Sequence, residues 1–299
     1  MLLHQVPSRV GASTLPRTLQ VAATAAVSPR SQLAADSFMK AWTSRQWIDR
    51  ADDFPAAPPS VQDMYETHLA MQQSAYADEL GSLGGYKIGA VGAEGEPCLY
   101  GPLFNDFLVE AAGRPGAKPL SSAAINLFQV EPEFAVVMAE DLPPRADGQP
   151  HDPSDVWSKV ASVVLCIEAC GRRGTSAVAS TLGPLGRFHD GLCAGGVVLG
   201  PRRAAKYFAA DSLASVKTEL LLNGEIVATG SGAALPFGGS VETGLAWLAN
   251  HLNARGLSLR AGHLVATGQT CIYNGVLVPG DRVVARFETL GEVEMVVEP

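Results

Sequence analysis

The chain has 299 residues, of which 47% are apolar and 17% are charged, and its 30 acidic side chains outnumber the 22 basic ones. This composition is typical of a globular protein with one large or two ordinary domains, and the acidic balance argues against nucleic acid as a partner. No apolar run reaches the roughly 20 residues that a membrane helix needs, so the sequence predicts no membrane-spanning segment.

Residues 1–34 differ from the rest of the chain. They carry Arg9, Arg17 and Arg30 with several serines, but no Asp or Glu. The pattern is compatible with an organelle transit peptide, Leu19 to Val27 could serve as a weak secretory core, and a disordered leader or an upstream start codon explains the same composition. We therefore treat 1–34 as a leader, disordered or cleaved, and exclude it from the fold.

The next region, 35–82, is expected to be helical. Apolar residues recur at helical spacing from Ala35 to about Trp47 and from Ser60 to about Leu80, on either side of the turn-forming FPAAPPS. After this region the sequence changes to short β-branched runs broken by Gly and Pro. The change predicts a boundary between an N-terminal helical region and a second domain over 83–299.

The domain over 83–299 is expected to be mostly β. Its candidate strands are short and rich in β-branched residues, and they are Tyr86 to Ile88, Phe134 to Met138, Val163 to Glu168, Val197 to Leu199, Thr218 to Leu222, Glu225 to Thr229, Leu264 to Thr267, Arg282 to Phe287 and Glu292 to Val297. Asn223-Gly224 predicts a type I′ hairpin. One helix is expected, with Ser240 as N-cap, Glu242 in its first turn and Gly256 as its stop.

Two carboxylates flank a proline in FQVEPEFAVVM, where the strand from Phe134 is expected to begin. Side chains alternate along an extended chain, so Glu131 and Glu133 point the same way, and they repel unless a proton or a cation lies between them. Glu168 ends the apolar run SVVLCIE in the same manner. Three such acids suggest a Mg²⁺ or Mn²⁺ site, although each could instead cap a strand or pair with an arginine.

Lys87 lies in GGYKIG, between two apolar residues of a candidate strand. Half buried there, it could have a lowered pKa and move protons; the alternative is a lysine that snorkels from the face of a sheet.

The five cysteines are odd in number and scattered, which favours reduced thiols and thus the cytoplasm, or an organelle matrix if the leader is a transit peptide. Cys166 and Cys170 have no second Cys/His pair near them in sequence, so we interpret them as small buried side chains rather than zinc ligands. His189-Asp190 resembles part of a catalytic triad, but no serine is marked as its nucleophile.

Several ordered motifs together resemble one family. They are GYKIG (85–89), YGPLFND (100–106), VEPEFAVVM (130–138), IEA (167–169), HDGLCAGGVVLG (189–200), NGEIVATGSGAA (223–234), AWLANHL (246–252), LVATGQT (264–270) and VPGDRVVARFETLGEV (278–293). From about Ala35 to its end the chain is similar to the fumarylacetoacetate hydrolase superfamily, and within it to the 2-oxopent-4-enoate hydratases and 4-oxalocrotonate decarboxylases of aromatic catabolism.

The resemblance implies an α+β fold, a mixed β roll of mostly antiparallel sheets with a small N-terminal helical region. It implies a homo-oligomer that can associate with a pathway partner enzyme. It also implies a site with one Mg²⁺ (or Mn²⁺) and residues in three roles: metal ligands Glu131, Glu133 and Glu168; catalytic residues Lys87 and Asp106; and substrate-binding residues Phe134, Asp190 and Gln269.

Three departures from the family pattern leave the substrate open. The family's L-T-S after K-I-G is Ala90-Val91-Gly92 here, its A-D-N-A-S is the stretch 189–193, and its T-G-S is Thr267-Gly268-Gln269. These changes spare the expected metal ligands but alter what surrounds the tail of the substrate.

The resemblance therefore predicts a lyase that adds water to an unsaturated 2-oxo acid, or to its dienol such as 2-hydroxypenta-2,4-dienoate, giving a 4-hydroxy-2-oxo acid. The alternatives are a decarboxylase of the 4-oxalocrotonate type and a hydrolase that cleaves a C–C bond of an acylpyruvate. A non-catalytic partner subunit is a further alternative, against which the intact glutamates and Lys87 argue.

Overall fold

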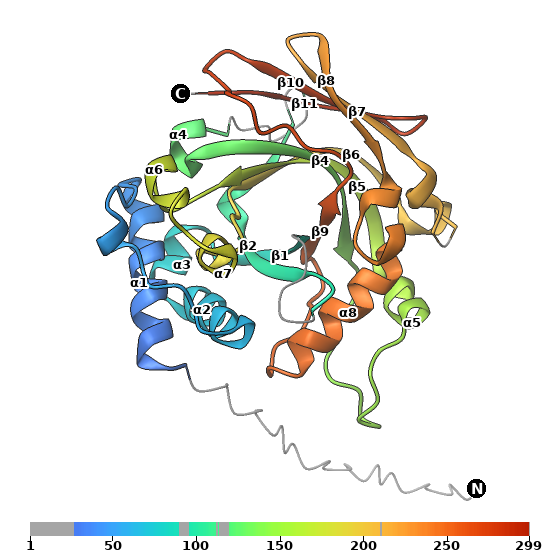
Figure 1. The fold of residues 1–299 in the computed structure, drawn as a ribbon. Helices are drawn as coiled ribbons and strands as arrows, with labels where there is room; N and C mark the ends of the chain where they lie inside the picture. Colours follow the sequence, from blue (N-terminus) through green and yellow to red (C-terminus); the bar gives the residue numbers. More distant parts are fainter. Residues whose placement is uncertain (1–26, 90–95, 112, 114–119, 210, 299) are drawn as a thin grey trace, which may run out of the picture.

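The computed structural model describes residues 27–89, 96–111, 113, 120–209 and 211–298. Most of the predicted leader and the departure at 90–92 lie outside these ranges. The described chain is an α+β fold with two β-sheets and several helices (Figure 1). None of the helices within the described ranges is long and apolar enough to cross a membrane.

The helices are α1 (Pro29–Ser44), α2 (Val61–Gln73), α3 (Tyr76–Glu79), α4 (Ser122–Ile125), α5 (Pro153–Ser158), α6 (Ser176–Ala179), α7 (Pro184–Phe188) and α8 (Val241–Asn253). The strands are β1 (Leu83–Gly89), β2 (Leu99–Phe104), β3 (Leu108–Glu110), β4 (Leu127–Met138), β5 (Val160–Gly171), β6 (Gly196–Ala204), β7 (Lys217–Leu222), β8 (Glu225–Ser231), β9 (Leu264–Gln269), β10 (Arg282–Phe287) and β11 (Gly291–Val296).

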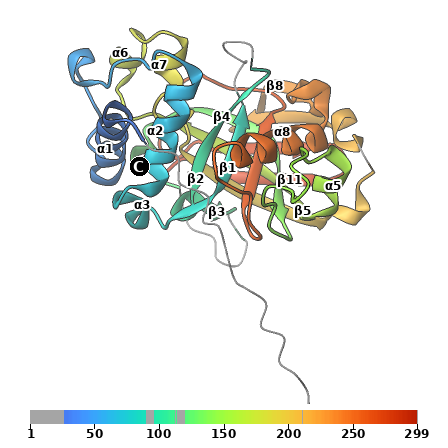
Figure 2. The same cartoon turned by 90° about the horizontal axis from the view of Figure 1, so that it is seen from below.

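The larger sheet has the order β2-β1-β9-β4-β5-β6-β3 and is mixed, because β1 pairs in parallel with β9 and β3 pairs in parallel with β6. The smaller sheet, β11-β10-β7-β8, is antiparallel throughout. In Figure 1 the smaller sheet covers one side of the curled larger sheet. Figure 2 shows α1 to α3 beside β2, with α8 and α5 grouped farther along the sheet.

The apolar core between the two sheets follows from strand alternation. On β4 the even-numbered side chains Val130, Phe134 and Val136 are buried, and Phe134 packs against Phe287 of β10 with ring centroids 5.3 Å apart. The odd-numbered residues of β4 therefore face the other way, into the concave side of the larger sheet.

The structure has a strand at each of the nine predicted positions, but the bounds of several strands differ from the predicted ones. All nine candidate strands are present, and the Asn223-Gly224 turn has positive φ at both residues, as a type I′ hairpin requires. However, β4 begins at Leu127 rather than Phe134, so Pro132 lies inside a central strand. The carbonyl of Pro132 accepts hydrogen bonds from Thr270. The N–H and C=O of a strand residue point to the same side, so the missing N–H of Pro132 falls on the side of β9, where the pairing shifts register.

The helical predictions need one correction. Helix α1 begins at Pro29, with Ser28 as its N-cap, so the helical region starts before residue 35, where the sequence pattern placed it. Pro29 at the first helical position has a φ that suits a helix start. The α8 prediction is confirmed: the side chain of Ser240 accepts a hydrogen bond from Thr243 N.

Candidate metal centre

The two central strands of the larger sheet place a pair of acids face to face. In the antiparallel pairing of β4 with β5, Glu131 lies directly opposite Glu168, and side chains opposite each other in such a pair have Cβ atoms only about 5 Å apart. Glu133 follows on the same side of β4 and is paired with Cys166. The three acids predicted as metal ligands thus share the concave side of the sheet, where the solvent exposure of Glu168 is 0% and that of Glu133 is 1%.

Lys87 reaches this group from a strand that is not adjacent. Its Nζ donates a hydrogen bond to Glu168 Oε1 and forms a buried ion pair with it. Strands β9 and β4 lie between β1 and β5, and in a flat sheet three strand spacings would separate β1 from β5 by about 14 Å. The contact therefore exists because the sheet curls, and the curl makes the concave side an enclosed site.

A glycine allows β1 to take this position. A Cβ on Gly85 would lie 1.8 Å from the carbonyl oxygen of Leu264 on β9, so only glycine permits the close approach of the two strands. The glycines that precede Lys87 in GGYKIG therefore have a packing role that the sequence did not reveal.

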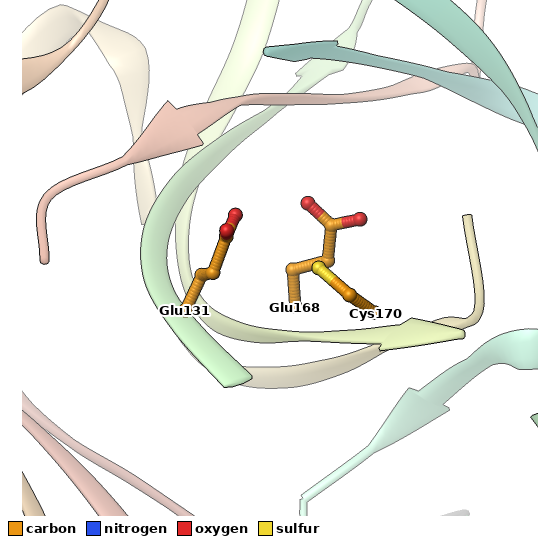
Figure 3. A group of neighbouring side chains, drawn as sticks. All are labelled: Glu131, Glu168 and Cys170. Carbon is orange, nitrogen blue, oxygen red and sulfur yellow. The ribbon is translucent and has the colours of Figure 1, made fainter. Parts of the chain in front are cut away.

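The sulfur of Cys170 belongs to the same cluster. Cys170 lies two residues beyond Glu168 on β5, and one ligand atom from each of Glu131, Glu168 and Cys170 lies within 4.8 Å of the others. Figure 3 shows the three side chains pointing into the space inside the curled sheet. Interpreting Cys170 as mere packing was therefore incomplete, whereas Cys166 is a buried thiol that donates to the carbonyl of Glu133.

Glu133 stands slightly apart from that three-residue group. Its Oε2 accepts a hydrogen bond from Gly268 N at 3.1 Å. Its Oε1 is buried and has no hydrogen-bond partner among the described residues. Glu131 is held from the other side by Gln129, whose amide donates to Glu131 Oε1 and also lies 3.8 Å from the sulfur of Cys170.

Burial and repulsion from neighbouring carboxylates raise the pKa of two of the acids, Glu131 and Glu133. Burial, and then the charge of Glu168, raise the pKa of Glu131 to about 7. Burial and the charges of Glu168 and Glu131 hold the pKa of Glu133 well above its usual range. Burial by itself would lower the pKa of Lys87, but Glu168 and the other acids raise it well above its usual range. The prediction that this lysine has a lowered pKa was therefore wrong, because its anionic neighbours outweigh its burial.

The cluster suits a divalent cation. When all are ionised, its three carboxylates outweigh its one ammonium by two charges, which is the charge that a single divalent ion neutralises. Glu168 Oε2 and Glu133 Oε1 are buried without a hydrogen-bond partner in the described part of the chain, and such orphaned oxygens are costly unless something binds them. Carboxylate oxygens are the ligands that Mg²⁺ and Mn²⁺ prefer.

A cavity of about 610 Å³ opens onto this cluster. Its wall includes Lys87, Glu131 and Cys170, together with Arg172 and Gln269. The volume is within the usual range for small-molecule sites, and the cavity places Glu131 and Lys87 within reach of a ligand.

Of the three predicted substrate-binding residues, two line the cavity and one does not. Gln269 lies on the cavity wall and is exposed there. Asp190 also lines the cavity, but its Oδ2 accepts a hydrogen bond from Arg173 N at 2.8 Å and lies 3.7 Å from Arg173 Nε. Phe134 is fully buried between the sheets, on the face of β4 opposite the acids, so the structure does not bring it to the site.

Asp106 is also outside the site. It lies in the short helical turn Asn105–Phe107 after β2, is exposed, and packs against the turn at Gly81. Asp106 is not among the described residues that form the cavity wall. We therefore assign it no proton-transfer role.

Gln129, Cys170 and Arg172 are site residues that the sequence reasoning missed. The signal was present: Gln129 lies two residues before Glu131, and Cys170 and Arg172 lie two and four residues after Glu168. Period-two alternation puts all of them on the face that carries the acids.

Comparisons with known proteins agree with this architecture. Residues 108–298 match the family described as fumarylacetoacetate (FAA) hydrolase C-terminal. The structure is similar to 4-oxalocrotonate decarboxylase from Pseudomonas putida G7 complexed with magnesium and adipate, with a TM-score of 0.72 and 22% identity over 90% of this chain and 97% of that chain. The same enzyme complexed with calcium and acetate gives 0.71, with the same identity and coverage.

A second enzyme is more distantly similar. Fumarylpyruvate hydrolase from Pseudomonas aeruginosa, in complex with Mn²⁺ and pyruvate, has a TM-score of 0.52 and 18% identity over 71% of this chain and 88% of that chain. At these identities the likeness to either enzyme concerns the fold.

Proposed function

Because the chain belongs to the fumarylacetoacetate hydrolase family, we propose that it is a divalent-metal-dependent lyase that adds water to an unsaturated 2-oxo acid. The observation that carries the proposal is the pairing of Glu131 with Glu168 on the concave sheet, with the ammonium of Lys87 beside them. The solved relatives that hold magnesium, manganese or calcium together with a carboxylic acid support a site of this kind.

Glu131, Glu133 and Glu168 would hold the ion. When bound, a divalent ion supplies Lewis acidity that stabilises negative charge developing on the 2-oxo oxygen of the substrate. The chain's own contribution is the position of that ion, which the three carboxylates would hold where the cavity opens onto Glu131.

Lys87 would supply the proton. Its pKa is raised by the neighbouring acids, so its Nζ is protonated and suited to act as a general acid rather than as a base. In hydration of a 2-oxo-3-enoic acid, the oxygen of water bonds to C4, C3 gains a proton, and the product is a 4-hydroxy-2-oxo acid. Lys87 Nζ, held by Glu168, would deliver the proton to C3.

Decarboxylation and C–C bond hydrolysis are the alternatives, because both also need negative charge stabilised at the 2-oxo oxygen. The products separate them. Incubation with 2-hydroxypenta-2,4-dienoate and Mg²⁺ should give a product heavier by one water, seen by mass spectrometry. Loss of CO₂ from a dicarboxylic analogue, or cleavage of an acylpyruvate, without any hydration would contradict the proposal.

The first prediction tests the metal centre itself. Glu131→Gln and Glu168→Gln each remove one anionic ligand, so turnover should be abolished and calorimetric Mg²⁺ binding should weaken by at least tenfold. Glu140→Gln, at an exposed acid that pairs with Lys159, is the matched control and should change neither. Full activity in EDTA would refute a metal-dependent reaction, and Mg²⁺ binding without turnover of any 2-oxo acid would favour a non-catalytic subunit.

A further inference from the structure

Cys170 is positioned by the same two central strands that carry the acids. It lies on β5 two residues after Glu168, and its register partner on β4 is Gln129, two residues before Glu131. Alternation therefore turns its side chain to the concave side, where Figure 3 shows the sulfur beside the two carboxylates. The residue is 2% exposed and belongs to the wall of the cavity. Strand pairing, and not a loop, thus fixes where the sulfur lies.

The sulfur is close enough to the acids to share an ion with them. One donor atom from each of Glu131, Glu168 and Cys170 lies within 4.8 Å of the other two. Donors bound to one ion at about 2.0–2.3 Å are about 3–4.5 Å apart, so small side-chain movements would bring all three onto a single ion. Glu168 Oε2 is an independent indication, because it is buried without a hydrogen-bond partner in the described part of the chain.

The hydrogen bonds of Cys170 differ from those of the cysteines near it. The thiols of Cys166 and Cys193 each donate to a backbone carbonyl. Cys170 instead accepts from the amide of Gln129, which lies 3.8 Å from its sulfur, and no acceptor for its S–H occurs among the residues that the structure describes. The same amide donates to Glu131 Oε1. It therefore holds the sulfur and that carboxylate side by side, and the sulfur keeps lone pairs that a cation can use.

A sulfur ligand changes which ion the cluster selects. Carboxylate oxygens suit the hard ion Mg²⁺, whereas thiolate sulfur is a soft donor that binds borderline ions such as Co²⁺ and Zn²⁺ much better than Mg²⁺. Zn²⁺ also accepts carboxylate ligands. A site that combines carboxylates with one sulfur therefore gains affinity for borderline ions that an all-oxygen site does not have.

We propose that Cys170 is a metal ligand, and that its sulfur makes the site selective for a borderline first-row ion, such as Co²⁺ or Zn²⁺, over Mg²⁺. This inference rests on the metal site of the proposed function and adds the class of the ion to it. When such an ion binds, the proton of the thiol passes to the solvent and the thiolate joins the carboxylates as a ligand. Mg²⁺ would bind the carboxylates and leave the thiol protonated.

Cobalt tests the sulfur contact directly. A thiolate bound to Co²⁺ gives a charge-transfer absorption band in the near ultraviolet, which carboxylate ligands do not give. The protein with one equivalent of Co²⁺ should show this band, and Cys170→Ser should lack it. Absence of the band from wild-type protein that binds Co²⁺ by calorimetry would overturn the inference.

Two other cysteines provide matched controls. Cys166→Ser changes a buried thiol on the same strand, two residues before Glu168, and Cys193→Ser changes a thiol on the same cavity wall. In both variants the serine hydroxyl can still donate to the carbonyl that the thiol contacts, and both should keep the band. The assignment to Cys170 is overturned if the band survives in Cys170→Ser, or if a control variant that still binds Co²⁺ loses it.

Calorimetry tests the selectivity. An outer hydrogen-bond partner of a ligand is worth about 10- to 100-fold in metal affinity, and a ligand should be worth at least as much. Cys170→Ser should therefore bind Co²⁺ at least about tenfold more weakly than the wild type, with little change in its affinity for Mg²⁺. The unchanged Mg²⁺ affinity would also show that the acids remain in place. Equal losses for the two ions in both Cys170→Ser and Cys170→Ala would overturn the proposed selectivity.

Oxalate, which carries only the chelating end of a 2-oxo acid, separates failure of this inference from failure of the proposed function. Oxalate bound with equal affinity by the Mg²⁺-loaded wild type and Cys170→Ser supports the metal site of the proposed function. In that case, an unchanged Co²⁺ affinity in Cys170→Ser overturns the sulfur ligand only. If the wild type binds neither Mg²⁺ nor Co²⁺, the proposed function falls, and the inference with it.

Discussion

Glu131 is the residue whose protonation should be visible near neutral pH. Its pKa rises from an ordinary 4.5 to about 7 in the folded protein, so between those values the folded state holds a proton that the unfolded state has lost. The metal-free protein should therefore lose stability as the pH rises from about 4.5 to about 7. Thermal unfolding in EDTA across this range checks the slope, which should be shallower in Glu131→Gln because that side chain cannot titrate.

Lys87 should matter both to the rate and to the metal-free fold. Lys87→Met removes the proton donor, so kcat should fall by about 10²- to 10⁴-fold while the affinity for oxalate changes little. Removing the ammonium also leaves Glu168 buried beside two other acids, which is strongly destabilising unless a cation replaces it. The loss of melting temperature should thus be larger in EDTA than in Mg²⁺. A kcat equal to that of the wild type would remove Lys87 from the chemistry.

The acids were predictable residue by residue, but their neighbours were not. Charged residues next to apolar strands are rare enough to attract notice, and Glu131, Glu133 and Glu168 all reach the concave side. Cys170 and Arg172 were overlooked because neither residue type is unusual at its position. Both residues matter because of contacts with β4: Cys170 lies beside Glu131, and Arg172 stacks on Phe128.

At the scale of elements, alternation along β4 places core side chains such as Phe134 on one face and the acids of the site on the other. This division can be tested. Phe134→Ala should destabilise the fold by about 3–5 kcal/mol through the cavity left against Phe287, measured by urea denaturation, while oxalate affinity stays near that of the wild type. Phe128→Ala, at a half-buried ring on the cavity wall, is the control and should cost less stability. A change in ligand affinity without a change in stability in Phe134→Ala would restore a substrate-binding role to that residue.

The sequence predicted the strands that consist of β-branched runs, but it did not predict strands or parts of strands that contain Gly or Pro. Strand β2 was missed because Gly101 and Pro102 interrupt it. Gly101 is needed there, since a Cβ would lie 2.5 Å from the carbonyl oxygen of Gly191. The start of β4 was misplaced for the same reason, because Pro132 lacks an N–H and therefore indicates the start or edge of a strand.

At the scale of the whole molecule, metal removal should lower stability. An ion that binds only the folded state stabilises it by about 2.7 kcal/mol at a concentration about one hundred times its dissociation constant. For a chain of this size that corresponds to a rise of several degrees in melting temperature. Scans with and without EDTA check this, and Glu131→Gln should show a smaller difference. Identical melting curves for the wild type would contradict an ion in the site.

The closure of the larger sheet was beyond the reach of local sequence patterns. Lys87 on β1 is far in sequence from Glu131 and Glu168 on β4 and β5, and it reaches Glu168 because the sheet curls, although β9 and β4 lie between β1 and β5. Only the resemblance of several ordered motifs to a known family anticipated this arrangement. Patterns of propensity and alternation describe single strands, whereas a site of this kind depends on how the strands are ordered.

A buried cation is one of the contacts that join the N-terminal helix to the cavity wall. The guanidinium of Arg173 lies 4.0 Å from the ring of Trp42 on α1 and holds Asp190 on the cavity wall. A version of this chain trimmed to begin at β1 would keep every acid of the cluster, yet it would expose Arg173 to water and release the loop that carries Asp190. The N-terminal helices therefore help to shape the cavity, although they contribute none of the proposed metal ligands.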